Sequence, residues 1–253
     1  MTQFSANLGF LWSELPLPDA IRAAKKAGFH AVECHWPYDT PVELVNAALT
    51  ETGMQMLGLN TRRGDLEKKE NGLCALPGRE ADARAVIDEA VAYARQIQAQ
   101  NVHVMAGFSS GHEAHEVFKQ NLMYACKLVE NDPINILIEP LNKFDAPGYF
   151  LSNSSQAQQI INEVGHPKLK LMFDCYHLQI MEGNLCASIK ELLPIIGHVQ
   201  FASVPDRGAP DCGEINYSFI FNYLQQLNYT TPLGAEYKPS SSTESSLAWL
   251  NNI

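Results

Sequence analysis

The segments INILIE (134–139), LKLMFD (169–174) and HVQFA (198–202) decide how this sequence folds. Each is a short apolar run of the kind found in buried β-strands, and each is followed by residues with helical periodicity. Strands that alternate with helices pair in parallel, because the helix carries the chain back to the end of the sheet from which it came. The three segments therefore predict consecutive βα units of an α/β protein.

The same alternation extends outward to both ends of the chain. The other strands are predicted at residues 4–10, 30–35, 54–59, 101–106 and 232–236. Helices are predicted at residues 18–27, 41–52, 79–99, 112–130, 154–164, 185–193, 216–227 and 242–252. Eight βα units in 253 residues match a (β/α)8 barrel, which uses about 250 residues as one domain. We therefore predict a single (β/α)8 (TIM) barrel domain over residues 1–253.

Glycines punctuate this pattern. Gly28, Gly53, Gly165 and Gly197 each stand where a predicted helix ends and the next strand begins. Glycine is favoured at the left-handed position that follows the last helical turn, so we expect these four residues to be C-caps. The irregular stretch 60–78 is expected to be a long loop after the third strand, and such loops often carry function.

Composition and motif content exclude several function classes. The 18 Lys and Arg against 28 Asp and Glu give a net charge of −10, which repels phosphate backbones and argues against nucleic-acid binding. No apolar run is long enough to span a membrane, and the start of the chain does not resemble a signal peptide, so we expect a cytoplasmic protein. Neither GxGxxG nor GxxxxGK[ST] occurs, which removes the usual signals for nicotinamide cofactors and ATP.

Polar residues stand at the ends of the strands in the second half of the chain. Glu139 ends INILIE, Asp174 ends LKLMFD, Gln200 lies in HVQFA, and Glu236 ends PLGAE (232–236). In a (β/α)8 barrel the catalytic residues come from the C-terminal ends of the strands, where these four converge. Three carboxylates and one amide form an oxygen-rich site of the kind that Mg²⁺ or Mn²⁺ prefers. Three adjacent negative charges require either a cation or a proton bound with a raised pKa.

Four segments together resemble one known family. They are IEPLNKFDAPGYFLSN (138–153), LMFDCYHLQIMEGN (171–184), GHVQFASVPDRGAPDCGEINY (197–217) and GAEYKP (234–239). Over essentially the whole chain the sequence resembles the hydroxypyruvate isomerase family of xylose-isomerase-like barrels, in which 2-oxo-tetronate isomerases also occur. The EPLN, FDxYH, VPDR and GEINY elements in combination are specific to this group, whereas a single Glu after a strand would mean little.

This resemblance implies a role for each polar strand end. Glu139, Asp174, Gln200 and Glu236 match the metal-facing positions, and Glu139 and Glu236 match the two glutamates that transfer the substrate proton. Several relatives in the wider superfamily have a histidine where this chain has Gln200. Since an amide is a weaker ligand than imidazole for transition metals, the expected cofactor is Mg²⁺ or Mn²⁺ rather than Zn²⁺. The resemblance also implies a small acidic sugar-derived substrate, and it is compatible with a homo-oligomer.

The residue types suit this chemistry independently of the family. Moving a carbonyl to the adjacent carbon requires removal of one proton, stabilisation of an enediolate, and return of a proton to the neighbouring carbon. Two carboxylates on opposite sides of the substrate perform both transfers, so Glu139 and Glu236 are predicted to be catalytic. The predicted reaction interconverts hydroxypyruvate with tartronate semialdehyde, or 2-oxo-tetronate with 3-oxo-tetronate, and the sequence does not choose between them.

Two further residues are predicted to bind substrate. His177, in FDCYH, is expected to donate a hydrogen bond to a substrate oxygen, and Arg207, in VPDR, to pair with the substrate carboxylate through its planar guanidinium. The sequence does not separate site-facing from interior roles for three other residues near strand ends, Glu33, His35 and His103. It also does not separate an anion contact from solvated loop charges for Arg62 and Arg63.

Three alternatives stay open. A ketose 3-epimerase on the same scaffold would use the same glutamate pair on a single carbon. A metal-dependent phosphodiesterase of the type that acts on abasic DNA would need several site histidines and a basic surface, which the acidic balance of this chain disfavours. A binding protein with an inactive site is disfavoured by the complete pair of glutamates.

Overall fold

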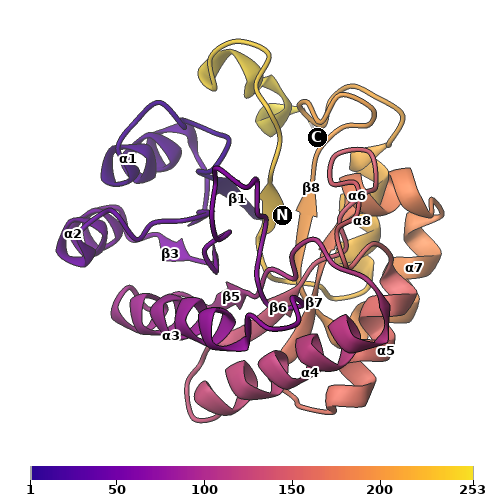
Figure 1. Ribbon diagram of the computed structural model, residues 1–253. Helices are drawn as coiled ribbons and strands as arrows, with labels where there is room; N and C mark the ends of the chain where they lie inside the picture. Colours follow the sequence, from indigo (N-terminus) through magenta and orange to yellow (C-terminus); the bar gives the residue numbers. More distant parts are fainter. Residues whose placement is uncertain (1, 253) are drawn as a thin grey trace.

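The computed structural model describes residues 2–252. All its strand pairs are parallel. The helices surround the strands as an outer ring (Figure 1). The strand order is β3-β2-β1-β9-β8-β7-β6-β5-β4. Its two end strands, β3 (Gln55–Met56) and β4 (Leu59–Asn60), are the two halves of the third predicted strand. Because Leu57 and Gly58 connect them directly, the sheet closes on itself. The predicted (β/α)8 barrel is therefore confirmed.

The other strands begin and end close to their predicted limits. They are β1 (Phe4–Asn7), β2 (Ala31–Glu33), β5 (Asn101–His103), β6 (Asn135–Ile138), β7 (Leu169–Asp174), β8 (Ile196–Phe201) and β9 (Leu233–Ala235). The helices of the outer ring are α1 (Leu17–Ala27), α2 (Val42–Thr52), α3 (Glu80–Gln96), α4 (Gly111–Leu128), α5 (Ser154–Val164), α7 (Leu185–Leu192) and α8 (Tyr217–Gln226). A short helix, α6 (Cys175–Met181), which the sequence did not predict, follows β7 directly, and the 3-10 turn η1 (Leu193–Ile195) precedes β8.

The helix predicted at residues 242–252 is wrong. This segment instead forms two 3-10 turns, η2 (Glu244–Ser246) and η3 (Ala248–Asn251). Serine hydroxyls compete for the backbone groups that a helix would use: the Ser245 and Ser246 hydroxyls donate to the carbonyls of Ser242 and Thr243. The fully buried Trp249 then anchors the segment by edge-to-face contacts with aromatic rings of the core.

Three of the four predicted glycine caps are confirmed, and one is wrong. Gly28, Gly53 and Gly165 are left-handed residues that follow α1, α2 and α5. Gly197 lies inside β8 with an ordinary backbone conformation. A Cβ at this position would lie 2.7 Å from both Leu137 and Lys170, so close packing between strands explains this glycine.

Side chains alternate between the two faces of each barrel strand. In β8, Val199 and Phe201 pack in the hydrophobic core, whereas His198 and Gln200 line a small cavity inside the barrel. The long stretch 60–78 is a loop between β4 and α3, as expected. No helix within residues 2–252 combines the length and the apolarity needed to cross a membrane.

Candidate active site

The four polar residues predicted from the strand ends all lie at the C-terminal end of the barrel. Glu139 directly follows β6, Asp174 is the last residue of β7, Gln200 is the second-last residue of β8, and Glu236 directly follows β9. All four are at most 5% exposed. Asp174 and Gln200 are register partners on adjacent strands. The neighbouring strands therefore bring these groups to one end of the barrel interior.

Glu139, Asp174 and His177 form one compact cluster. Each offers a ligand atom, and these atoms lie within 4.8 Å of one another. The His177 Nε2 is 3.6 Å from Asp174 Oδ2 and 3.9 Å from Glu139 Oε1. These two oxygens are buried and have no hydrogen-bond partner among residues 2–252. Because a buried carboxylate oxygen without a partner is costly, the cluster has the character of a binding site for a ligand.

Asp174 has a second task at the start of α6. Its Oδ1 accepts a hydrogen bond of 2.8 Å from the backbone N–H of Tyr176 and thereby caps this short helix. The cap fixes the orientation of the carboxylate, so that Oδ2 faces His177 and the Arg207 guanidinium. The same short helix carries His177, so one local structure positions two of the clustered side chains.

Glu236 stands in a different environment, because Arg207 reaches it from the loop after β8. The Arg207 Nη2 donates to Glu236 Oε2 at 2.6 Å and lies 3.7 Å from Asp174 Oδ2. The rings of Phe10 and Tyr176 lie 4.8 and 5.0 Å from the Arg207 guanidinium carbon and restrict its movement. The other Glu236 oxygen, Oε1, accepts hydrogen bonds from Asn7 Nδ2 at 2.9 Å and His35 Nε2 at 3.1 Å.

These surroundings shift the pKa values of the carboxyl groups in opposite directions. Burial, together with the charges of Glu236 and Asp174, raises the pKa of Glu139 well above its ordinary value. Burial and the charge of Glu236 raise the pKa of Asp174 to about 7. Burial alone would also raise the pKa of Glu236, but Arg207 and the His35 hydrogen bond outweigh it and lower that pKa to about 2. Within one site, Glu139 therefore favours the protonated form and Glu236 the ionised form.

Gln200 is held by a network beneath the site that the sequence did not reveal. Its Nε2 donates to Glu33 Oε2 at 3.0 Å, and His198 Nε2 donates to the same oxygen at 2.9 Å. The Gln200 carbonyl oxygen is buried and has no partner among the described residues. Gly234 on β9 leaves room for this network, since a Cβ there would lie 2.2 Å from Glu33 Oε1. The only sequence signal for His198 is its place two residues before Gln200, on the same face of the strand.

The structure also assigns places to the residues that the sequence left open. Glu33 and His103 are buried inside the barrel, and His103 Nδ1 lies 3.6 Å from Glu139 Oε2. Burial lowers the pKa of His103 to about 3, so this ring is neutral. Arg62 and Arg63 have other partners: Arg62 pairs with Glu89 at 2.8 Å, and Arg63 stacks on the ring of Trp36.

The donor groups of this end of the barrel suit a divalent cation. Three buried oxygens, from Glu139, Asp174 and Gln200, have no hydrogen-bond partner within residues 2–252. If Glu139, Asp174 and Glu236 are all ionised, Arg207 balances one of their three charges and two negative charges remain. Oxygen donors with excess negative charge are the set that Mg²⁺ and Mn²⁺ prefer. The metal-ligand assignments of Glu139, Asp174, Gln200 and Glu236 stay predictions.

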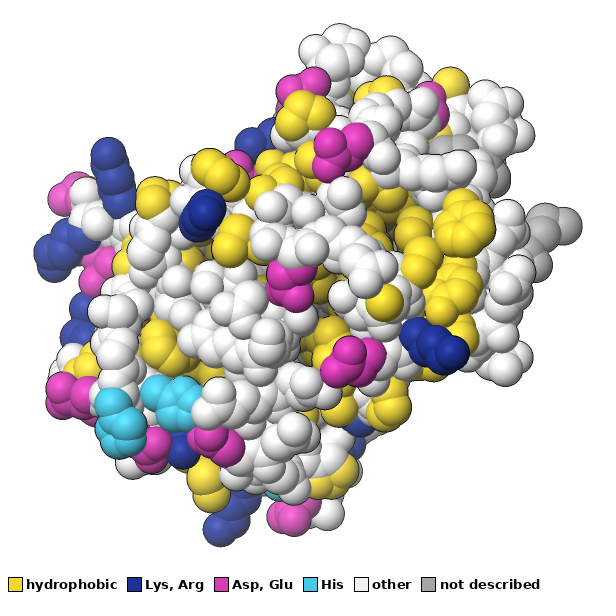
Figure 2. All heavy atoms as spheres, turned by 90° about the vertical axis from the view of Figure 1, so that its right-hand side faces the viewer, with side chains coloured by type: hydrophobic (Ala, Val, Ile, Leu, Met, Phe, Trp, Pro, Cys, Tyr) yellow, Lys and Arg dark blue, Asp and Glu magenta, His cyan; other side chains and the backbone are white. Residues whose placement is uncertain are grey.

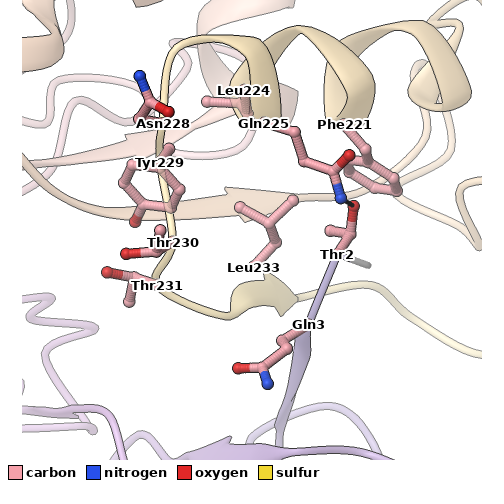
Figure 3. Close-up of a pocket in the computed structure, with 10 residues that line it drawn as sticks. All are labelled: Thr2, Gln3, Phe221, Leu224, Gln225, Asn228, Tyr229, Thr230, Thr231 and Leu233. Carbon is pink, nitrogen blue, oxygen red and sulfur yellow. Dashed lines mark hydrogen bonds between the residues drawn. The ribbon is translucent and has the colours of Figure 1, made fainter.

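A second cavity lies at the opposite end of the barrel, between α8, the start of β1 and the segment before β9 (Figure 3). It has a volume of about 460 Å³, and its lining side chains are all uncharged. Gln225 and Thr2 are joined there by a hydrogen bond of 2.7 Å, drawn as a dashed line in Figure 3. This lining holds neither a carboxylate nor a histidine, the groups that most often transfer protons in enzymes.

Comparison with known proteins identifies close relatives along the whole chain. The sequence is 39% identical to the 2-oxo-tetronate isomerase of Cupriavidus necator, over 99% of this chain and 98% of that protein. It is 36% identical to the hydroxypyruvate isomerase of Escherichia coli, over 99% of both chains. A D-psicose 3-epimerase structure shares the fold with a TM-score of 0.79 at 16% identity, which shows similarity of fold alone.

The fold comparison gives a still closer superposition. A crystal structure from Brucella melitensis, described as an AP endonuclease of family 2, matches with a TM-score of 0.95 and 36% identity, over 99% of this chain and 98% of that one. Residues 21–253 match the family model described as a xylose isomerase-like TIM barrel. The barrel, the polar strand ends and these matches agree, and the chain therefore belongs to the xylose isomerase-like TIM barrel family.

Proposed function

We propose that this isomerase moves the carbonyl group of a short 2-oxo hydroxyacid to the neighbouring carbon, with Glu139 and Glu236 as the proton-transfer pair. One observation carries the proposal: the surroundings of these two carboxyls shift their pKa values in opposite directions within one site. Two titratable groups that differ in this way are the mark of an acid and a base that act together. Relatives named as a 2-oxo-tetronate isomerase and a hydroxypyruvate isomerase supply the substrate class.

The reaction is a proton relay between adjacent carbons. In one direction the ionised Glu236 removes the proton from C3, the carbon that bears the hydroxyl group, and an enediolate forms. The protonated Glu139 then delivers a proton to C2, the former carbonyl carbon, and the hydroxyl proton on the C3 oxygen passes to the C2 oxygen, so that C3 becomes the carbonyl carbon. Proton exchange with solvent returns the two glutamates to their starting states. The roles reverse in the other direction, and substrate and product are isomers, so no other reactant is consumed.

The remaining side chains bind and orient the substrate. The Arg207 guanidinium, held between two aromatic rings, presents a planar donor fork to which a substrate carboxylate binds. The His177 Nε2 faces the gap between Glu139 and Asp174, where a substrate oxygen fits. Glu139, Asp174, Gln200 and Glu236 would hold the divalent cation, which when bound polarises the carbonyl and balances the excess negative charge.

Two alternatives have less support. A ketose 3-epimerase would use the same glutamates, but it has no need of an arginine placed to receive a carboxylate. A phosphodiesterase acting on DNA would need a multi-metal site and a basic surface. Among residues 2–252, the metal-ligand cluster is the single group of Glu139, Asp174 and His177. On the face shown in Figure 2, the Lys and Arg side chains are interspersed with acidic ones and do not merge into one basic surface.

Proton NMR of the purified protein in D₂O tests the proposal. Hydroxypyruvate and 2-oxo-tetronate are supplied separately, with Mg²⁺ or Mn²⁺ and again after chelation. We expect carbonyl migration with deuterium incorporated from solvent, and the faster acid identifies the chain length. Loss of turnover after chelation, restored by adding metal, would support the metal assignment. Absence of exchange with both acids, together with inversion at one carbon of a neutral ketose, would replace the proposal with epimerisation.

A further inference from the structure

The side-chain amide of Asn142 has an orientation that its own loop determines. Asn142 is fully buried in the segment after β6, and its Oδ1 accepts hydrogen bonds from the backbone N–H groups of Phe144 at 3.0 Å and Asp145 at 2.9 Å. Only the oxygen of an amide accepts hydrogen bonds, so the NH₂ group must point the other way. Asn142 Nδ2 accordingly donates to Asp145 Oδ2 at 3.0 Å.

The same NH₂ group meets the ring of His177. Asn142 Nδ2 lies 2.8 Å from His177 Nδ1, and the backbone N–H of Asn142 donates to this nitrogen at 3.1 Å. A nitrogen that faces two N–H donors must offer its lone pair to them, so Nδ1 carries no proton. An imidazole ring whose Nδ1 carries no proton is neutral and keeps one proton on its other nitrogen. Its single proton is therefore on Nε2.

We infer that Asn142 is a positioning residue that fixes His177 as the tautomer protonated on Nε2 and directs this N–H into the site. The inference rests on the proposed function and extends it from Glu139 and Glu236 to the segment after β6, which carries Asn142. The Nε2 is 3.6 Å from Asp174 Oδ2 and 3.9 Å from Glu139 Oε1, which is too far for a hydrogen bond to either. The N–H is thus free to donate to a substrate oxygen that lies between the carboxylates.

The tautomer decides what His177 contributes. A histidine that binds a metal offers a lone pair to it and usually donates its other ring N–H to a carbonyl or carboxylate. His177 has the reverse arrangement, because Nδ1 faces donors and Nε2 carries the proton. His177 lies close enough to Glu139 and Asp174 to share a metal ion with them. It acts instead as a neutral hydrogen-bond donor to a substrate oxygen that gains charge in the enediolate.

A direct test is ¹⁵N NMR of the histidine rings, which reports the tautomer whether or not the protein turns over any substrate. We expect His177 to show an unprotonated Nδ1 and a protonated Nε2. In Asn142→Asp the carboxylate keeps the contacts of Oδ1, but its other oxygen accepts instead of donating. The tautomer protonated on Nδ1 should therefore gain population, although the backbone N–H still faces Nδ1. The matched control is Asn162→Asp, on the exposed face of α5, which adds the same charge and should leave the tautomer unchanged. A wild-type ring protonated on Nδ1 would overturn the inference.

Mn²⁺ binding gives a second test that does not depend on the folding of the Asn142 variant. Electron paramagnetic resonance measures the Mn²⁺ affinity of each variant. The affinity of His177→Gln should stay within about two-fold of wild type, whereas the affinity of Asp174→Asn should fall about 10-fold or more. An equal loss in both variants would identify His177 as a metal ligand and overturn the inference. If wild-type protein turns over neither acid but shows the expected tautomer, the proposed substrates fail while the role of Asn142 stands.

Discussion

The two sides of the candidate site hold the same functional group in opposite states. On the β6 side, Glu139 is surrounded by the neutral rings of His103 and His177, and burial raises its pKa. On the β9 side, Glu236 binds Arg207, Asn7 and His35, and its pKa falls to about 2. Both glutamates are 5% exposed, so burial does not separate them. The partners of a buried carboxylate, more than its depth, therefore decide whether it serves as acid or base.

The largest expected effect comes from removing the acid on the β6 side. Glu139→Gln keeps the size of the side chain but cannot deliver a proton, so kcat should fall about 10²–10⁴-fold. The measurement is turnover of the two acids together with deuterium incorporation from solvent. Glu163→Gln, which changes an exposed carboxylate on α5, serves as the control and should keep full activity. Near-normal turnover of Glu139→Gln would remove the assignment of this residue as acid.

The next largest effect concerns the positively charged Arg207 on the β9 side. Arg207→Gln removes the charged partner of Glu236 and the planar donor for the substrate carboxylate, so KM for the acid should rise about 10–100-fold. KM for a neutral ketose, if the enzyme accepts one, should change less. Arg207→Lys keeps the charge but loses the fork and much of the aromatic stacking, and it should fall in between. Equal increases for acid and ketose would contradict the binding role.

A smaller effect tests the hydrogen-bond network of Glu33, His198 and Gln200 beneath the site. Gly234→Ala places a Cβ 2.2 Å from Glu33 Oε1 and 2.8 Å from Gln200 Cγ, so the free energy of unfolding should fall by about 1–3 kcal/mol. The matched control is Gly58→Ala, whose Cβ would make ordinary contacts at 3.6 Å or more. Urea unfolding measures both variants. Equal stability of the two would show that the Glu33 network shifts freely and does not hold Gln200 in place.

The smallest expected effect concerns Glu163, an exposed carboxylate that can be compared with the two buried glutamates. Hydrogen bonds from His115, Gln159 and Lys119 lower the pKa of Glu163 from 4.5 to about 2. Because the pKa of Glu163 is lower in the folded protein than in the unfolded chain, its hydrogen bonds stabilise the folded state at a pH above the unfolded-state pKa. This stabilisation is lost as the pH falls towards 2. The difference in urea midpoint between wild type and Glu163→Gln should therefore be small near neutral pH and should vanish in acid. A difference that grows in acid would reverse the sign of this interaction.

The sequence was enough to predict the barrel and the strand ends, because an apolar run and the polar residue that closes it are adjacent in the chain. Glu139, Asp174 and Glu236 were predictable in this way. Contacts across the barrel were not, since Glu33 and His198 are 165 residues apart and meet only when the barrel register is known. The same holds for Asn142, in the segment after β6, and His177, on α6.

Local interactions explain where the structure departs from the sequence patterns. The last helix was predicted from its apolar spacing, but serine hydroxyls and the buried Trp249 determine the conformation of that segment. The short helix α6 was missed because its first turn follows the strand residue Asp174 without a loop, and Asp174 is both strand end and helix cap. The cap predicted at Gly197 is wrong, because packing against Leu137 and Lys170 explains this glycine.

The division of the third strand into β3 and β4 has a consequence for motion. Each half forms only two register pairs with its neighbour, whereas β7 and β8 share four. In native-state hydrogen exchange, the amides of residues 55–60 should therefore exchange by local opening before those of β7 and β8. The third strand lies across the ring from β7 and β8. Local opening there would leave the β7–β8 pairing, and with it Asp174 and Gln200, in place.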